Sequence, residues 1–307
     1  MPPALRPLFP EDLAEALPLV ADAVPALRLT REDLERNLFE PAELGGSVQV
    51  AAVEDGVLAG VGCAALRRSA RAPGLVGHIK LVAVRPDRRR RGWGGRILAE
   101  LESWLEGRGA ARVLTDGAAP VYLQPGVPEK AREALGFFAR RGYRAVETRR
   151  SLVARIDAKG GALSRPAPPA PGDDVVIERA RPDDREAIAA SIAAGFPEEW
   201  AAEAALALGI EGASLHVARR GSELAGFAVA GLWARNAFGP MGTLPAFRGR
   251  GLGAALLERC LDDLRSRGED RAVISWIGPE AFYRKLVAVE EALRFALLEK
   301  ALLRRDG

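Results

Sequence analysis

The chain has 307 residues, of which 48% are hydrophobic, and its formal net charge at pH 7 is +3. This length predicts two domains, each long enough to bury a core. The sequence has no run of 18 or more apolar residues, and its first residues lack the basic and apolar regions of a secretory signal. We therefore expect a cytoplasmic protein with no membrane partner.

The composition also argues against a metalloprotein and against a nucleic-acid-binding protein. The two cysteines, Cys63 and Cys260, lie far apart and lack the spacing of a zinc site or a disulfide framework, so we expect no metal. The arginines are dispersed along the chain, and aromatic residues make up only 6% of it. We therefore expect no nucleic-acid partner.

The predicted elements run in the same order twice along the chain. Each half opens with a short strand, a Pro-acid-Asp turn that begins at Pro10 or Pro182, and a helix with acidic residues in its first turn. Two strands follow, joined by a hairpin turn at residues 54–56 in the first half and 220–222 in the second. A third strand, a loop rich in arginine and glycine, a helix, another strand and a last helix complete each half. The simplest interpretation is a mixed α/β domain that has been duplicated.

The predicted helix after each loop has a clear apolar stripe. Its apolar residues recur at the three- and four-residue spacing of one helical face, which predicts packing against a core. These residues are Ile97, Leu98, Leu101, Trp104 and Leu105 in the first half, and Leu256, Leu257, Cys260, Leu261 and Leu264 in the second.

A proline-rich segment separates the two halves. Residues 164–174 contain four prolines and no helix or strand periodicity, which is typical of a semi-rigid linker. We therefore predict an N-terminal domain at residues 1–160, a linker at 161–174 and a C-terminal domain at 175–307.

The loop before each of these helices suits an anion. It reads RRRRGWGGRIL at residues 88–98 and FRGRGLGAALL at residues 247–257. A helix N-terminus has unpaired N–H groups and a partial positive charge, and glycines let a ligand approach the backbone closely. A pyrophosphate is the expected ligand. Residues 249–254 also match the dinucleotide fingerprint, but they come late in their half and follow predicted antiparallel hairpins, so we do not expect a nicotinamide or flavin site.

The order strand, Pro, Arg-x-x-Gly-x-Gly, helix resembles the acyl-CoA loop of the GNAT superfamily of N-acyltransferases. The resemblance covers nearly the whole chain as two tandem units. It implies a mixed α/β (α+β) fold with two GNAT-like domains, each a mixed, splayed, mainly antiparallel sheet flanked by helices. It also implies acetyl-CoA as the acyl donor. The implied acyl-CoA-binding residues are Val82, Val84, Arg89, Arg91, Gly92, Trp93, Gly94 and Gly95 in the first half, and Met241, Thr243, Arg248, Gly249, Arg250, Gly251, Leu252, Gly253 and Ala254 in the second.

The resemblance also implies a catalytic residue. The last helix of the family commonly carries a Tyr that protonates the departing thiolate. Tyr283 holds this position in the second half, whereas Phe138 holds it in the first and has no proton to give. The tandem organisation is similar to that of the mycothiol synthases, in which the C-terminal unit does the chemistry. We therefore expect the active site in the C-terminal domain, and we expect Tyr143 to be a core residue.

The general base stays open at this stage. His78 alternates in phase with Lys80, Val82 and Val84 and is one candidate, although a lone strand histidine is more often structural. His216 is a weaker candidate. Some members of the family use a carboxylate on the third strand, and neither half has one there.

Two further residues call for a structural explanation. Pro240 lies in the third strand of the second half, where it cannot donate a ladder hydrogen bond, so a bulge or a splay is expected there. Trp276 follows the next strand and either lines an acceptor pocket or packs in the core.

The function implied by the resemblance is an N-acetyltransferase that moves an acetyl group from acetyl-CoA to an amine by direct attack in a ternary complex. The acceptor is a small-molecule or peptide amine, and the protein is a monomer or a homodimer. The alternative is a non-catalytic protein that binds acyl-CoA for sensing or scaffolding, and the Phe at position 138 favours this alternative for the first half.

Overall fold

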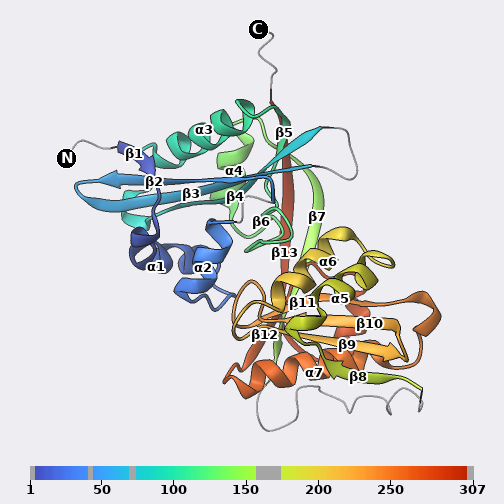
Figure 1. Ribbon diagram of the computed structural model, residues 1–307. Coiled ribbons are helices and arrows are strands. Elements are labelled where there is room, and N and C mark those ends of the chain that lie inside the picture. Colours follow the sequence, from blue (N-terminus) through green and yellow to red (C-terminus); the bar gives the residue numbers. More distant parts are fainter. Residues whose placement is uncertain (1–3, 41–43, 69–73, 157–173, 303–307) are drawn as a thin grey trace. The chain divides into compact units, whose positions relative to one another are not determined.

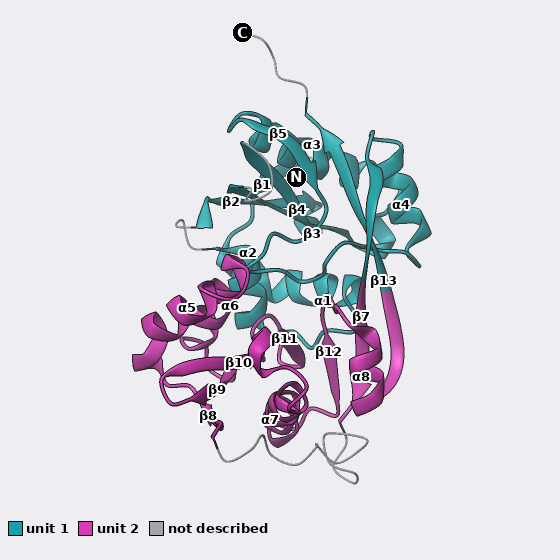
Figure 2. Cartoon of the chain, turned by 90° about the vertical axis from the view of Figure 1, so that its right-hand side faces the viewer, with its two compact units in different colours: residues 1–149, 294–307 teal, residues 150–293 magenta. Residues whose placement is uncertain are grey.

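The computed structural model describes residues 4–40, 44–68, 74–156 and 174–302 (Figure 1). The chain forms two compact units. Unit 1 consists of residues 1–149 and 294–307, and unit 2 consists of residues 150–293 (Figure 2). Each unit contains a mixed sheet with helices on both faces, which agrees with the predicted fold class.

Unit 1 contains the elements of the first half. Its described helices are η1 (Pro10–Asp12), α1 (Leu13–Ala23), α2 (Arg31–Leu38), η3 (Pro86–Arg88), α3 (Trp93–Glu106) and α4 (Arg132–Ala139). Its strands are β1 (Ala4–Pro7), β2 (Ser47–Glu54), β3 (Val57–Arg68), β4 (Leu75–Val84), β5 (Ala110–Leu114), β6 (Val127–Pro128), the start of β7 (Arg144–Arg155) and the end of β13 (Ala288–Ala301). The order is β1-β2-β3-β4-β5-β13, in which β4 and β5 run parallel and the other neighbours run antiparallel. Helix α3 covers one face of these strands, and α1 and α2 cover the other (Figure 1).

Unit 2 repeats this arrangement. Its described helices are η4 (Pro182–Asp184), α5 (Arg185–Ala193), α6 (Glu198–Ala207), η5 (Pro245–Phe247), α7 (Leu252–Ser266) and α8 (Glu280–Leu286). Its other strands are β8 (Val176–Arg179), β9 (Ser214–Arg220), β10 (Glu223–Ala230), β11 (Ala237–Thr243) and β12 (Arg271–Ile274). The order is β8-β9-β10-β11-β12-β7, and here β11 and β12 are the parallel pair.

The last strand of each half completes the sheet of the other unit. Strand β7 leaves unit 1 after residue 149, and its residues 152–155 pair with β12 in unit 2. Strand β13 enters unit 1 at residue 294, and its residues 299–301 pair with β5. Both strands therefore change colour along their length in Figure 2. The compact units thus differ at their ends from the halves expected at residues 1–160 and 175–307. Residues 161–173 of the expected linker lie outside the described residues.

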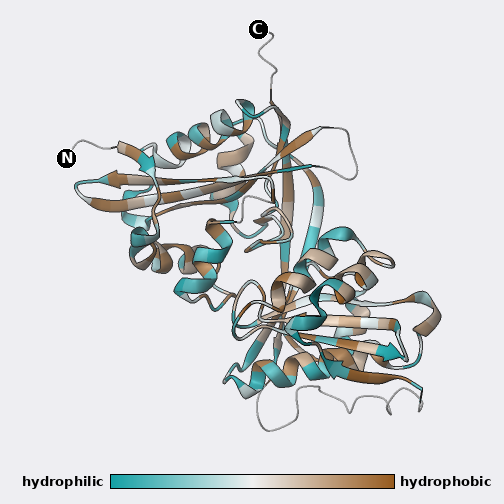
Figure 3. Cartoon of the chain, in the orientation of Figure 1, coloured by the Kyte–Doolittle hydropathy of each residue, from teal (hydrophilic) through white to brown (hydrophobic). Residues whose placement is uncertain are grey.

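The predicted helix stripes form the centre of each core. In α3, Ile97, Leu98, Leu101 and Leu105 are buried, and in α7 the five predicted stripe residues are fully buried. Complete burial of one such side chain is worth roughly 1.5–3 kcal/mol. Glycines on the sheet let α3 approach closely, because a Cβ on Gly62 would lie 2.3 Å from the Ile97 side chain. Figure 3 shows hydrophobic colours along much of β3, whereas α7 alternates between hydrophilic and hydrophobic residues.

The sheet opens beside the central strand of each unit. Strand β4 pairs with β5 only over residues 75–78, so the described pairing leaves residues 79–84 without a β5 partner. Strand β11 pairs with β12 only at Ala237 and Phe238. The irregularity predicted around Pro240 is confirmed, because the register between β10 and β11 shifts between Ala228 and Ala230. A gap of this kind exposes backbone groups to a ligand.

Candidate active site

The arginine and glycine loops of the two units have the same backbone conformation. Gly92 (φ 87°) and Gly251 (φ 80°) are the left-handed N-caps of α3 and α7, a conformation that glycine adopts without strain. In each loop an arginine closes the turn onto the preceding strand. Arg89 Nε donates to the Val84 carbonyl at 3.1 Å, and Arg248 Nε donates to the Thr243 carbonyl at 3.1 Å.

The N-termini of α3 and α7 keep their first N–H groups available. Neither N-cap side chain forms a capping hydrogen bond, since both residues are glycines. A Cβ built on Gly92 would meet no atom within 4 Å, so the space in front of this helix end is open. An anion is stabilised at such a position by the unpaired N–H groups and the helix dipole.

The last helix packs against the glycine loop in the same way in both units. A Cβ on Gly94 would lie 3.3 Å from the Phe137 ring, and a Cβ on Gly253 would lie 3.3 Å from the Phe282 ring. The next residue along each helix is Phe138 or Tyr283. The ring pairs match closely, with centroids 5.2 Å apart for Phe137–Phe138 and 5.1 Å apart for Phe282–Tyr283, both at 82°. Phe138 and Tyr283 are therefore structural counterparts.

In unit 1 the predicted residues surround a pocket of about 760 Å³. Its walls come from β4, the start of α3, the end of α1, residues 115–128 and α4. The lining includes seven of the eight residues predicted for the first half: Val82, Val84, Arg89, Gly92, Trp93, Gly94 and Gly95. The eighth, Arg91, is exposed and lies 3.3 Å from the Glu54 carboxylate instead.

The pocket of unit 1 is strongly basic. Eight basic and two acidic residues line it: Lys80, Arg88, Arg89, Arg90, Lys130, Arg132, Arg140, Arg141, Asp22 and Glu133. Clustered arginines stabilise a polyanionic ligand such as a diphosphate. The pocket therefore has the charge that the sequence predicts for a pyrophosphate site.

Arg141 holds a fixed position at the start of α3, and the sequence analysis missed it. Its Nη1 donates to the Phe137 carbonyl at 3.1 Å, and its guanidinium lies 3.9 Å from the centroid of the Phe137 ring. Its Nη2 lies 2.6 Å from where a Cβ on Gly95 would be, so only glycine fits at position 95 without displacing it. Counting from the Phe138 and Tyr283 pair, the residue of unit 2 at this position is Leu286.

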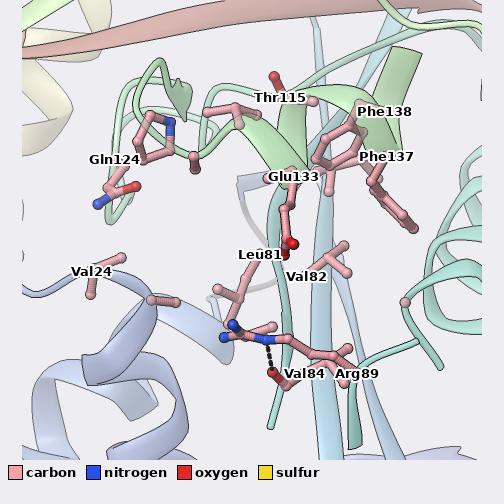
Figure 4. Close-up of a pocket in the computed structure, with 18 of the residues that line it drawn as sticks. Val24, Leu81, Val82, Val84, Arg89, Thr115, Gln124, Glu133, Phe137 and Phe138 are labelled. Atoms are coloured by element: carbon pink, nitrogen blue, oxygen red, sulfur yellow. Dashed lines mark hydrogen bonds between the residues drawn. The ribbon is translucent and has the colours of Figure 1, made fainter. Parts of the chain in front are cut away.

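Polar side chains line the pocket on the side away from the loop. Thr115 and Gln124 come from the segment after β5, and Glu133 comes from the first turn of α4. Figure 4 shows the Glu133 carboxylate pointing into the pocket toward Leu81 and Val82. Sequence reasoning missed Glu133, because it considered carboxylates only on the strands.

The prediction that His78 shares a strand face with Val82 and Val84 is wrong. The register between β3 and β4 shifts at Lys80, and this extra residue breaks the alternation. Val84 packs toward α3, whereas Lys80 Nζ donates to the Asn37 carbonyl at 2.6 Å on α2. His78 follows a glycine that packs on α3, so it faces the α2 side, and it does not line the pocket.

His78 instead belongs to a buried polar network with Asp116 and Arg149. Its Nδ1 is hydrogen-bonded to Asp116, and Arg149 Nη1 donates to the other carboxylate oxygen at 3.3 Å and to the Pro125 carbonyl at 3.3 Å. Burial alone would raise the pKa of Asp116, but the interactions with His78 and Arg149 outweigh it and hold that pKa at about 2. The network fixes both ends of residues 116–125, which carry Gln124.

A second buried network surrounds the bulge in β4. The Glu40 carboxylate pairs with both Lys80 and Arg67. Cys63 lies nearby, and burial raises the pKa of its thiol to about 12, so it stays protonated and unreactive. These interactions hold the bulge against α2.

In unit 2 the predicted residues also lie together. Met241 and Thr243 end β11, Arg248 to Gly251 form the loop, and Leu252, Gly253 and Ala254 begin α7. Gly242 is covered on one face, because a Cβ there would lie 2.3 Å from the Phe196 ring.

Tyr283 is buried on α8 at the position that the sequence predicts for a proton donor. Its ring packs against Phe282 and against Phe238, whose centroid is 6.4 Å away. Burial raises the pKa of its hydroxyl to about 12, so this group stays protonated at neutral pH. That protonation state is the one that a general acid needs.

The remaining candidates have structural partners. His216 Nε2 lies 2.8 Å from the Asp263 carboxylate on α7. Tyr143 is buried and donates to Glu102 at 2.8 Å, as expected for a core residue. Trp276 is 39% exposed just beyond β12, so it is not a core residue, and its backbone N–H donates to Ser151 Oγ at 3.2 Å.

Neither a metal cluster nor a membrane span is found in the part of the chain that the structure describes. No group of three or more His, Cys, Asp or Glu side chains there is arranged to hold a metal ion. No described helix is long and apolar enough to cross a membrane.

The fold and the loops together define a class of protein: a duplicated, splayed α/β domain with arginines beside a helix N-terminus, an arrangement of the kind that suits phosphate groups. Two sequence profiles make this class specific. The profile of the acetyltransferase (GNAT) family matches residues 13–124, and that of the acetyltransferase (GNAT) domain matches residues 211–286. The chain belongs to the GNAT family, carries two GNAT domains in tandem and is an acyltransferase.

Solved structures share this fold at low sequence identity. A tandem GNAT protein from the clavulanic acid biosynthesis pathway, solved without AcCoA, is 17% identical with a TM-score of 0.70, over 97% of this chain and 98% of its own. A GCN5-related N-acetyltransferase from Sphaerobacter thermophilus is 22% identical with a TM-score of 0.66, over 97% and 95%. A GCN5-related glucosamine N-acetyltransferase region of a fungal multi-domain GH3 β-N-acetylglucosaminidase is 16% identical with a TM-score of 0.74, over 97% of this chain but only 38% of that longer protein. A comparison with curated protein sequences finds no match.

Proposed function

We propose that this protein is an N-acetyltransferase that moves an acetyl group from acetyl-CoA to a small-molecule or peptide amine by direct attack in a ternary complex. The observation that carries the proposal is the loop geometry, which is repeated with the same arginine hydrogen bond and the same left-handed glycine in both units. GNAT enzymes use acetyl-CoA as donor, and this geometry suits its pyrophosphate.

Two parts of the donor would find partners among the residues of unit 1. The pyrophosphate would meet the N–H groups of α3, with Arg89 and Arg141 beside it. The pantetheine arm would lie along residues 79–84 of β4, whose edge has no β5 partner in the described pairing. A strand rises about 3.3 Å per residue, so these six residues offer roughly 20 Å of backbone.

In unit 2 we propose that Tyr283 assists the departure of the thiolate. The amine nitrogen attacks the thioester carbonyl carbon, the C–N bond forms, and the resulting tetrahedral oxyanion collapses with cleavage of the C–S bond. The phenol of Tyr283 gives its proton to the sulfur as this bond breaks. A positioned general acid accelerates such a step typically by ~10²–10⁴-fold.

Two measurements on the full chain test this function. Titration calorimetry with acetyl-CoA counts the donor sites, and a thiol reagent follows the release of free CoA with a panel of amines. We expect up to two donor sites per chain. We expect Gly251→Glu to remove the site of unit 2, because it puts a negative charge and a side chain at a left-handed N-cap where phosphate must meet the backbone.

The outcomes distinguish an acetyltransferase from a protein that only binds acyl-CoA. Donor binding with release of CoA in the presence of an amine supports the acetyltransferase. Donor binding without release with any amine would make this chain an acyl-CoA-binding protein. Undiminished two-site binding in Gly251→Glu would refute the assignment of the loop.

A further inference from the structure

Unit 1 has a donor pocket but lacks the tyrosine expected of an active site. Phe138 occupies the position of Tyr283, and a phenyl ring carries no proton. The pocket nevertheless continues beyond the donor path, to a side lined by Val24, Leu123 and Gln124. A pure donor site needs no such extension.

Glu133 lies between the two sides of the pocket. In Figure 4 its carboxylate stands beside Leu81 and Val82, with Phe137 and Phe138 on one side and Val24 and Gln124 on the other. Strand residues 79–84 form the proposed path of the pantetheine arm, so this carboxylate faces the path from the opposite wall.

Of the two acidic residues that line the pocket, Glu133 is the one without a basic partner among the described residues. The other lining acid, Asp22, lies 3.7 Å from Arg89 Nη2 at the loop end of the pocket. Among the described residues, Glu133 is exposed and forms no ion pair within 4.0 Å. An acid in the first turn of a helix also stabilises the helix dipole, but this role does not require the side chain to point into a pocket.

We propose that unit 1 is a second acyl-transfer site, in which Glu133 binds the ammonium form of the acceptor and takes its proton. This inference rests on the proposed function, because it assumes acetyl-CoA as the donor. Transfer of one proton from R–NH₃⁺ to the carboxylate gives the neutral amine. The amine nitrogen then forms its bond to the thioester carbon, and the C–S bond breaks. The thiolate receives the proton from the Glu133 carboxylic acid, and the second amine proton leaves to solvent.

The pocket also indicates the class of acceptor. Val24 and Leu123 supply an apolar wall, Gln124 supplies one amide, and Glu133 supplies one negative charge. This set suits a primary amine with an apolar body and a single polar group.

The test separates the two units by mutation. Tyr283→Phe serves as the background, because it lowers turnover in unit 2. The remaining turnover is then measured in three double variants, which add Glu133→Gln, Glu133→Asp or Glu100→Gln to this background. Glu100 is an exposed helix residue of α3 that does not line the pocket, so it controls for the loss of one charge. The substrates are acetyl-CoA and a series of primary amines of increasing apolar length.

We expect Glu133→Gln to lower kcat of the Tyr283→Phe background by ~10-fold or more, with little change in the KM for acetyl-CoA. Glu133→Asp should restore part of the rate, and Glu100→Gln should have no effect. A purely structural role would not lower kcat while leaving donor binding intact.

Three results would overturn the inference. Unchanged kcat in Glu133→Gln would exclude its role in proton transfer. A raised KM for acetyl-CoA at constant kcat would make Glu133 a contact of the pantetheine arm. If Tyr283→Phe alone abolished turnover while unit 1 still bound the donor, unit 2 would be the single active site. The proposed function would then stand, but the inference about unit 1 would fail. If the unaltered protein neither binds acetyl-CoA nor releases CoA, the proposed function itself fails.

Discussion

Replacement of Arg141 by leucine, the residue at the matching position of unit 2, should weaken CoA binding in unit 1. The guanidinium is already held by the Phe137 carbonyl at 3.1 Å and by the Phe137 ring at 3.9 Å, so little side-chain entropy is lost when a phosphate binds. It also adds its charge to the positive end of α3. Hydrogen bonds to charged groups contribute about 1.5–3 kcal/mol, which corresponds to a rise in Kd of roughly 10- to 150-fold.

Titration calorimetry with CoA on the full chain measures this effect, with Gly251→Glu as background so that only unit 1 is titrated. The matched control is Arg108→Leu, because Arg108 also stacks on an aromatic ring, with its guanidinium 4.1 Å from the Trp104 centroid, but at the other end of α3. The reverse change, Leu286→Arg, should strengthen binding in unit 2. Equal weakening in Arg141→Leu and Arg108→Leu, or no weakening in either, would refute the assigned role of Arg141.

Two further outcomes are expected. Tyr283→Phe should lower turnover by at least ~10-fold, whereas Phe138→Leu should lower it much less, because only Tyr283 has a proton to give. Steady-state release of CoA measures both effects. A larger loss in Phe138→Leu than in Tyr283→Phe would contradict the assignment of Tyr283 as general acid. In the folded chain the pKa of Asp116 is about 2, below its ordinary value of 3.8. The ionised carboxylate therefore stabilises the fold by on the order of 2 kcal/mol above pH ~4. This stabilisation is lost as the pH falls toward 2. The difference in urea midpoint between the unaltered chain and Asp116→Asn should therefore shrink between pH 6 and pH 3, and a constant difference would contradict this linkage.

The sequence predicts the repeated architecture well because its signals are local. The stripe from Ile97 to Leu105 depends only on helical spacing, and it forms the core against the sheet. The irregularity at Pro240 follows from the missing N–H of proline, and the register shift is found there. The two loops are recognisable because the N-cap of each helix is left-handed, a conformation that favours glycine, and glycines stand there at positions 92 and 251.

The parts that the sequence does not reveal depend on contacts between distant segments. Arg141 reaches the start of α3 from the turn after α4, almost fifty residues later, and nothing in the pattern around it distinguishes it from the neighbouring surface arginines. The orientation of His78 depends on one extra residue at Lys80, which no alternation rule locates. Glu133 reads as an ordinary acid in a first helical turn until the pocket beside it is seen.

The exchange of β7 and β13 sets the order in which this chain can fold. Unit 2 is one continuous stretch of chain, whereas unit 1 needs residues from 294 onward to cover the edge of β5. During synthesis, the edge of β5 therefore has no partner until residues 294–301 emerge, and such an edge promotes association with other chains. A chain that ends at residue 293 should keep the cooperative unfolding of unit 2 and lose that of unit 1. The N-terminal half, although made first, would then be the last part of the molecule to reach its native state.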